Sequence, residues 1–256
     1  MRITLSTDDL PAIKAYLHRS LPDQKPSLRV EAVARGFGFA TYAGLRNALS
    51  ADPITVPADD RRFCAELGIP FEADNGFNRF LSRSLARVEL HRVLDAHAML
   101  TQRGFDSAWM PGVGCERDKS LKERRALLAE RRLEAYEDDW SFDQFELAWI
   151  YLSRQQKIKS INRRTSSYGL KHRAENLMRE FGHFRPLGNY VSNGMLIAAA
   201  YALGFDVRPI APDNYNAYLN ISMVTVNRSR GRDVRSINED PSLVAAMYGD
   251  LAREAA

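Results

Sequence analysis

The side chains of this protein that could do chemistry are most concentrated in a basic run in the C-terminal half. No Asp or Glu occurs between Glu146 and Glu175, and this acid-free stretch also contains His172. Its seven Lys and Arg residues are Arg154, Lys157, Lys159, Arg163, Arg164, Lys171 and Arg173. Clustered cations attract polyanions such as nucleic acids. A solvated helix face is the alternative, although such faces usually mix charges of both signs.

The net charge of the whole chain does not reveal this basic segment. The protein has 256 residues, with 36 Lys and Arg against 32 Asp and Glu, so its formal net charge is only +4. Residues 141–185 hold nine basic and four acidic side chains, an excess of +5, whereas the other residues sum to −1. The hydrophobic fraction of 45% is ordinary for a globular protein and excludes a disordered chain or a fibrous repeat.

The basic run lies where two predicted helices meet. Ser141 is a suitable N-cap for one helix, a polar turn follows, and a second helix is predicted over 167–181. In a helix-turn-helix unit the start of the second helix meets base edges, and hydroxyls and backbone N–H groups there hold phosphate. Plain N-capping is the alternative role of Ser166 and Ser167. With the basic tract at 228–235, the candidate DNA-binding residues are Arg154, Lys157, Lys159, Arg163, Arg164, Thr165, Ser166, Ser167, Tyr168, Lys171, His172, Arg228, Arg230 and Arg232.

Patterns for catalysis and metal binding are weak. Cys64 and Cys115 form no CxxC motif and the five histidines show neither HxH nor HExxH spacing, so we predict no metal site and no cofactor. Tyr168 and His172, one helical turn apart, could support acid–base chemistry. Carboxylates for a nuclease occur at 116–118, beside Lys119, and at 137–139, but form no recognised pattern. We therefore predict no catalytic residues and a protein that is not an enzyme.

Capping signals and hydrophobic periodicity predict a mainly α, multi-helical fold. An N-terminal domain, residues 1–50, is expected to contain helices over 8–20, 27–35 and 42–49, the last capped by Thr41. The second and third helices meet at a glycine turn, as in a helix-turn-helix. Three arginines of this domain could face a phosphate backbone: Arg29, Arg35 and Arg46.

Residues 51–256 are predicted to form a second helical domain. It contains the basic helix-turn-helix-like unit at 141–181 and at most a short β element near 217–226. A helix that is apolar on all sides and therefore buried is expected over 195–203. Further helices are predicted over 60–67, 78–103, 118–137 and 241–254.

Two stretches resemble known bacterial proteins. Residues 27–45 show a Ser, an apolar helix ending in Ala34-Arg35, a Gly-aromatic turn and a helix that begins at Thr41. This pattern resembles a small helical domain found fused to glyoxalase-superfamily domains. The resemblance implies a compact helical module that could bind nucleic acid, without glyoxalase chemistry. Residues 166–175 and 190–200 are similar to uncharacterised proteins of plasmids and integrative elements, which implies only a genomic setting.

Together these observations favour a DNA-binding regulatory or accessory protein of a bacterial mobile element. The alternatives are a protein-interaction inhibitor that uses the same basic face, acting against host defence or in conjugation, and a nuclease-like enzyme. The expected partners are double-stranded DNA, a protein partner or a second copy in a homodimer, and no membrane. No signal peptide and no apolar run of roughly 18 residues is present, so a cytoplasmic, and for a DNA-binding protein nucleoid-associated, location is expected.

Overall fold

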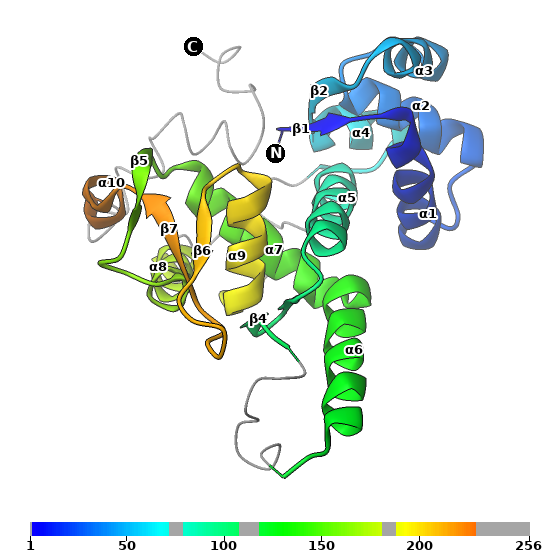
Figure 1. The fold of residues 1–256 in the computed structure, drawn as a ribbon. Coiled ribbons are helices and arrows are strands. Elements are labelled where there is room, and N and C mark those ends of the chain that lie inside the picture. The colour runs from blue at the N-terminus through cyan, green and yellow to red at the C-terminus, as the bar shows by residue number, and fades with distance from the viewer. Residues whose placement is uncertain (1, 72–78, 108–117, 181–187, 229–256) are drawn as a thin grey trace. The chain divides into compact units, whose positions relative to one another are not determined.

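The chain folds into α-helices joined by a few short antiparallel strands (Figure 1). The structure is a computed structural model and describes residues 2–71, 79–107, 118–180 and 188–228. Within these ranges there are ten α-helices and seven strands, so the predicted mainly α class is confirmed. None of the described helices is long and apolar enough to cross a membrane.

The contacts between residues divide the chain into two compact units, which are described separately. The first contains the described residues up to Glu89, and the second contains those from Leu90 onward. The predicted domain division, 1–50 and 51–256, is not tested by this clustering and stays a prediction.

The first unit is built from short helices and one pair of strands. β1 pairs antiparallel with β2, with Ile3 opposite Val56. Thr41 caps α3 through a hydrogen bond from Gly44 N, as the sequence predicts. The elements are β1 (Arg2–Leu5), the 3-10 helix η1 (Thr7–Asp9), α1 (Leu10–Ser20), α2 (Pro26–Gly36), α3 (Tyr42–Ala51), β2 (Ile54–Pro57), α4 (Asp60–Leu67) and the first part of α5 (Phe80–Ala96).

A buried carboxylate joins α4 to the start of α5. Asp60 accepts hydrogen bonds from Leu81 N at 2.7 Å and from the Ser82 hydroxyl, so it satisfies N–H groups that the first turn of α5 leaves open. Burial, together with the charge of Asp60, raises the pKa of the neighbouring Cys64 thiol to about 12. Cys64 is therefore an inert core thiol rather than a reactive one.

Two of the three arginines expected to face phosphate, Arg29 and Arg35, contact other groups of the first unit, whereas Arg46 is exposed on α3. Arg29 is buried, and its guanidinium donates to the carbonyl oxygens of Leu21 at 2.8 Å and Gln24 at 2.7 Å. The expectation that Arg29 faces phosphate is therefore wrong. Arg35 is partly exposed and lies 3.5 Å from the Glu66 carboxylate. A helix-turn-helix in this unit stays a prediction.

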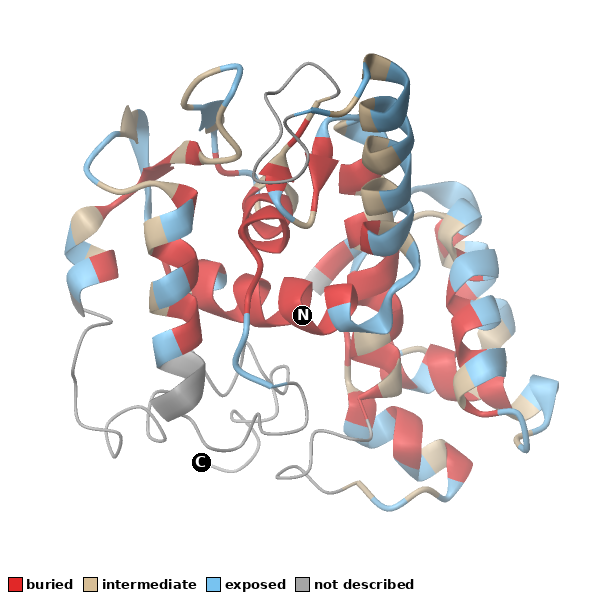
Figure 2. Cartoon of the chain, turned by 90° about the horizontal axis from the view of Figure 1, so that it is seen from below, coloured by how far each residue is buried: buried red, intermediate tan, exposed pale blue. Residues whose placement is uncertain are grey.

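The second unit surrounds two buried helices. α7 packs against both α9 and α8, and Figure 2 shows α7 and α9 largely in red. Every residue of α9 from Asn193 to Ala200 is buried, so the all-round burial predicted over 195–203 is confirmed for 195–200, whereas residues 201–203 are half-buried. The elements are the end of α5, β3 (Leu100–Thr101), β4 (Gly104–Phe105), α6 (Leu121–Glu137), α7 (Asp139–Ser153), β5 (Lys157–Asn162), α8 (Ser167–Glu180), α9 (Asn193–Ala202), β6 (Val207–Pro209), β7 (Ala217–Ile221) and α10 (Met223–Arg228).

The helix predicted over 78–103 is too long. α5 ends at Ala96, and a β3–β4 hairpin follows it. The Arg132 guanidinium of α6 donates to Leu94 O at 3.0 Å and to Ala98 O at 2.6 Å, and thereby satisfies carbonyl groups at the helix end. The side chain that ends α5 comes from a distant part of the sequence, which local periodicity does not reveal.

The prediction of at most a short β element near 217–226 is also wrong. β7 accounts for residues 217–221, but it is the central strand of a sheet with the order β5-β7-β6. β5 occupies residues 157–159, which the sequence predicts as the end of the first helix, and reaches the first residue of the predicted turn, Asn162, so no short turn joins α7 to α8. These strands have only three to six residues, too few for a clear alternating pattern.

Asn193, the first residue of α9, holds the surrounding loops together. Its amide nitrogen donates to Arg103 O and to Tyr215 O, both at 2.9 Å. The next residue, Gly194, donates its N–H to Gln102 O at 2.9 Å. The start of α9 therefore touches the backbone of the β3–β4 hairpin directly.

We predict that Gly194→Ala destabilises the protein by about 3 kcal/mol, because the new Cβ would overlap the backbone carbonyl of Thr101. Helix propensity alone predicts the opposite sign, a stabilisation of about 1 kcal/mol. The free energy of unfolding in urea distinguishes the two, and a stabilised variant would contradict the close packing of α9 on the hairpin.

Candidate nucleic-acid interface

The exposed cations of the basic run lie on β5 and on the turn after it. Lys157 and Lys159 are exposed on the strand, and Arg163 and Arg164 are exposed immediately beyond its end. The Arg164 N–H donates to Asn162 Oδ1 at 2.9 Å, which orders the turn. Among the described residues none of these four cations has an acidic partner within ion-pair distance. We call these four residues the basic edge.

The sheet presents the basic edge at its border. In the part of the chain that the structure describes, β5 pairs with β7 on one side only, so it is an edge strand there. β7 is anchored by the buried side chains of Ala217, Leu219 and Ile221. The Lys157 ammonium lies 5.4 Å from the centre of the Phe205 ring, and this contact positions its stem. The buried strand β7 thus supports the edge strand β5, whose cations are exposed. This arrangement is suited to contacts with phosphate.

The hydroxyl residues after the turn are mostly structural. Ser167 is buried, and its hydroxyl donates to Asn193 Oδ1 at 2.7 Å and accepts from Ala217 N at 3.0 Å. It therefore ties α8 to α9 and to β7, which excludes the predicted contact with phosphate. Thr165 and Ser166 are half-buried.

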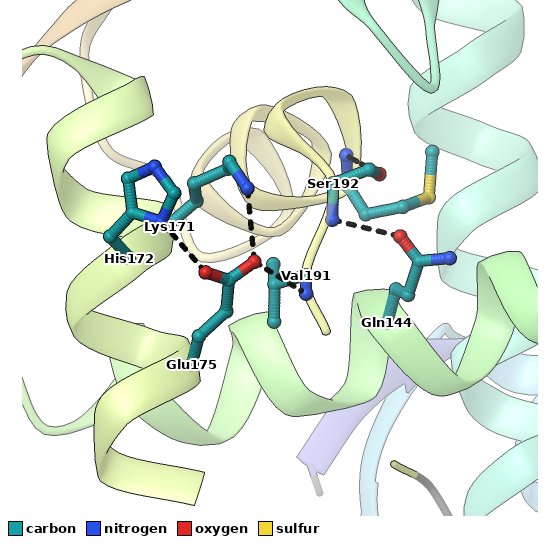
Figure 3. Close-up of polar contacts among 7 residues, drawn as sticks. Gln144, Lys171, His172, Glu175, Val191 and Ser192 are labelled. Atoms are coloured by element: carbon teal, nitrogen blue, oxygen red, sulfur yellow. Dashed lines mark hydrogen bonds and ion pairs between the residues drawn. The ribbon is translucent and has the colours of Figure 1, made fainter. Parts of the chain in front are cut away.

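Lys171 is the clearest departure from the predicted surface. Only 7% of its side chain is exposed, and its ammonium donates to Glu175 Oε1 at 2.9 Å (Figure 3). Glu175 also accepts from Val191 N at 3.2 Å and, through its other oxygen, pairs with His172 Nδ1 at 2.8 Å. The positive charge of Lys171 is thus neutralised inside the protein, so Lys171 does not belong to a DNA-contacting face.

The protonation of Glu175 follows from these partners. Burial by itself would raise the pKa of its carboxyl, but the hydrogen bonds from Lys171, Val191 and His172 and the charge of Lys171 outweigh burial, and the pKa is lowered. The carboxylate is therefore ionised in the folded protein at neutral pH. Gln144 continues the network, because its side-chain oxygen accepts from Ser192 N at 2.8 Å (Figure 3).

Two exposed aromatic residues flank Lys171 and a third stacks on one of them, and the prediction included only Tyr168. The Lys171 ammonium lies 5.2 Å from the ring centre of Tyr168 and 4.8 Å from that of Tyr190. Tyr190 stacks on Trp140, with ring centres 5.3 Å apart and planes within 17°. We call Trp140, Tyr168 and Tyr190 the aromatic patch. They come from α7, from α8 and from the segment before α9, so no local sequence signal could have joined them.

The remaining candidate DNA-binding residues are not part of the basic edge. Arg154 is half-buried directly after α7, and Arg228 is the last residue of α10. Arg230 and Arg232 lie outside the described residues. Arg173, of the same basic run, donates to Val226 O at 3.3 Å and so braces α10 against α8.

The residues considered for a nuclease-like enzyme lie on α8, at the junction of α6 and α7, and at 116–118, of which 116 and 117 are outside the described residues. Within the described ranges no group of three or more His, Cys, Asp or Glu side chains is placed to hold a metal ion. Tyr168 and His172 do meet edge to face, with ring centres 4.6 Å apart. His172 is turned toward Glu175, and 48% of its side chain is exposed. Asp138, of the acidic run at 137–139, caps α7 through Trp140 N.

We predict that Lys171→Met destabilises the folded protein by about 3 kcal/mol, since it leaves the buried Glu175 carboxylate without its main partner. Lys122→Met is the matched control, because Lys122 is exposed on α6 and its loss is expected to change stability by less than about 0.5 kcal/mol. Denaturant unfolding measures both, and equal values would show that the Lys171–Glu175 pair is energetically unimportant.

The lowered pKa of Glu175 also predicts a pH dependence. The folded state binds fewer protons at this carboxyl than the unfolded state, so the contribution to stability is present above the unfolded pKa and is lost as the pH falls through the folded pKa. The stability difference between the wild type and Glu175→Gln should therefore narrow as the pH is lowered below 4.5, the ordinary value. A difference that stays constant in acid would contradict the lowered pKa.

Comparisons with known proteins do not assign this chain to a family. No protein-family model, no curated protein and no solved structure matches the chain. A function can therefore be argued only from the residues themselves.

Proposed function

We propose that this protein binds duplex DNA through the basic edge, Lys157, Lys159, Arg163 and Arg164. The observation that supports the proposal is the exposure of these four cations together on an edge strand and its turn, without an acidic partner among the described residues. Cations so placed release counterions when they meet phosphates, which is the main source of affinity for a nucleic-acid backbone.

The proposed role is that of a regulatory or accessory protein of a bacterial mobile element. The genomic setting comes from the resemblance of residues 166–175 and 190–200 to plasmid and integrative-element proteins. The contacts proposed here are to the DNA backbone, so they position the protein and carry no base specificity. The same edge could instead meet an acidic protein surface, and the salt dependence of DNA binding separates the two.

The test removes two cations of the basic edge, Arg163→Ala together with Arg164→Ala. Each phosphate contact contributes about 0.9 to the slope of log affinity against log salt, so the slope of duplex binding should fall by about 1.8. Fluorescence anisotropy of a labelled duplex at several salt concentrations measures the slope.

The matched control removes two exposed cations from the mixed-charge helix α6, Lys122→Ala together with Arg125→Ala. The control should keep the wild-type slope, because acidic side chains alternate with these cations along α6. Equal slopes for the wild type and both variants would overturn the proposal. Failure of the wild type to bind duplex DNA, together with retention of a protein partner after nuclease treatment, would favour the protein-interaction alternative.

A further inference from the structure

The aromatic patch is left unused by the proposed contacts to the duplex. Half or nearly half of each residue is exposed: 49% of Trp140, 52% of Tyr168 and 45% of Tyr190. Large aromatic side chains dominate the energetics of cores and interfaces, so three of them gathered at a surface require a partner.

Contacts with buried groups of the protein fix the position of the aromatic patch. The Lys171 ammonium contacts both tyrosine rings and is itself fixed by the buried Glu175 carboxylate. Trp140 stacks on Tyr190 and follows the capping residue Asp138 at the start of α7. These contacts place the rings before any partner arrives, which lowers the entropic cost of binding.

The charges around the patch indicate what it accepts. Arg163 and Arg164 precede Tyr168 by a few residues, whereas the exposed acids of 137–139 precede Trp140. The charge of Lys171 is neutralised by Glu175, so the patch itself offers aromatic surface rather than net charge. A ligand with flat rings and an anionic backbone fits this arrangement if its rings stack on the aromatic patch and its backbone extends from Tyr168 toward Arg163 and Arg164, away from the acids before Trp140.

We infer that the aromatic patch is a stacking platform for unpaired bases of a single-stranded nucleic acid, and that Arg163 and Arg164, which shortly precede Tyr168 in the chain, take its phosphates. Proteins that bind single strands combine cations along the backbone with aromatic side chains on which bases stack. Bases paired within a duplex are stacked on one another and cannot use such a platform. The inference rests on the proposed function, to which it adds a preference for a single strand or for a duplex with an unpaired segment.

The test compares three probes: an oligothymidine of about 12 nucleotides, the corresponding oligouridine and a duplex. Tyr168→Leu together with Trp140→Leu removes two stacking rings, and binding to the single strands should weaken by about tenfold or more, since stacking contributes strongly per base. Duplex binding should change by less than about twofold, because the basic edge is intact. Tyr168→Phe together with Trp140→Phe keeps aromatic rings and should retain most single-strand binding.

A second measurement does not depend on the folding of the leucine variants. Oligothymidine should quench the part of the wild-type tryptophan emission that Trp140→Phe removes. Absence of this quenching at saturating oligonucleotide, or unchanged single-strand affinity in a folded leucine variant, would overturn the inference.

The outcomes also separate this inference from the proposed function. A wild type that binds the duplex but neither single strand overturns the stacking platform and leaves the basic edge intact. A wild type that binds single strands, with affinity lost in the leucine pair and a normal salt slope in Arg163→Ala with Arg164→Ala, supports the patch and overturns the basic edge. Comparison of oligothymidine with oligouridine shows whether the platform distinguishes DNA from RNA.

Discussion

The candidate site depends on the hydrogen bonds and the ion pair that the buried carboxylate of Glu175 makes. It accepts from the Lys171 ammonium, the His172 ring and the Val191 N–H, so it links two turns of α8 to the segment that leads into α9. A charge this deeply buried is tolerated only because every partner is in place. The Lys171 ammonium in turn contacts both the Tyr168 and the Tyr190 rings.

Because Lys171 is paired with Glu175 inside the protein, the residues of the basic run fall into two groups with different roles. Lys171 and Arg173 point toward the protein, where they neutralise a carboxylate and hold α10. Lys157, Lys159, Arg163 and Arg164 lie outside, on an edge strand and its turn. The sequence shows one continuous run without acids, whereas the folded protein has a smaller basic edge and, on other elements, an aromatic patch. Both proposals follow from that separation.

Elements with strong local signals could be predicted. Thr41 caps its helix, Gly68 ends α4 in the left-handed region, and the apolar residues before Gly204 form a buried helix. Elements that depend on distant partners could not. α5 ends where Arg132 satisfies its carbonyl groups, and β5 is a strand because β7 lies beside it. A strand that needs a remote neighbour carries little information in its own residues.

The sequence by itself determined the mainly α class, the local helix ends and the concentration of positive charge between Glu146 and Glu175, because these follow from residue type and spacing. Only the tertiary structure decided which cations remain outside and which aromatic rings meet. Burial and pairing are properties of contacts between residues such as Trp140 and Tyr190, which are far apart in the chain. Lys171 and Glu175 are close in the chain, but the strength of their ion pair also depends on the tertiary structure, because burial strengthens the attraction between the two charges.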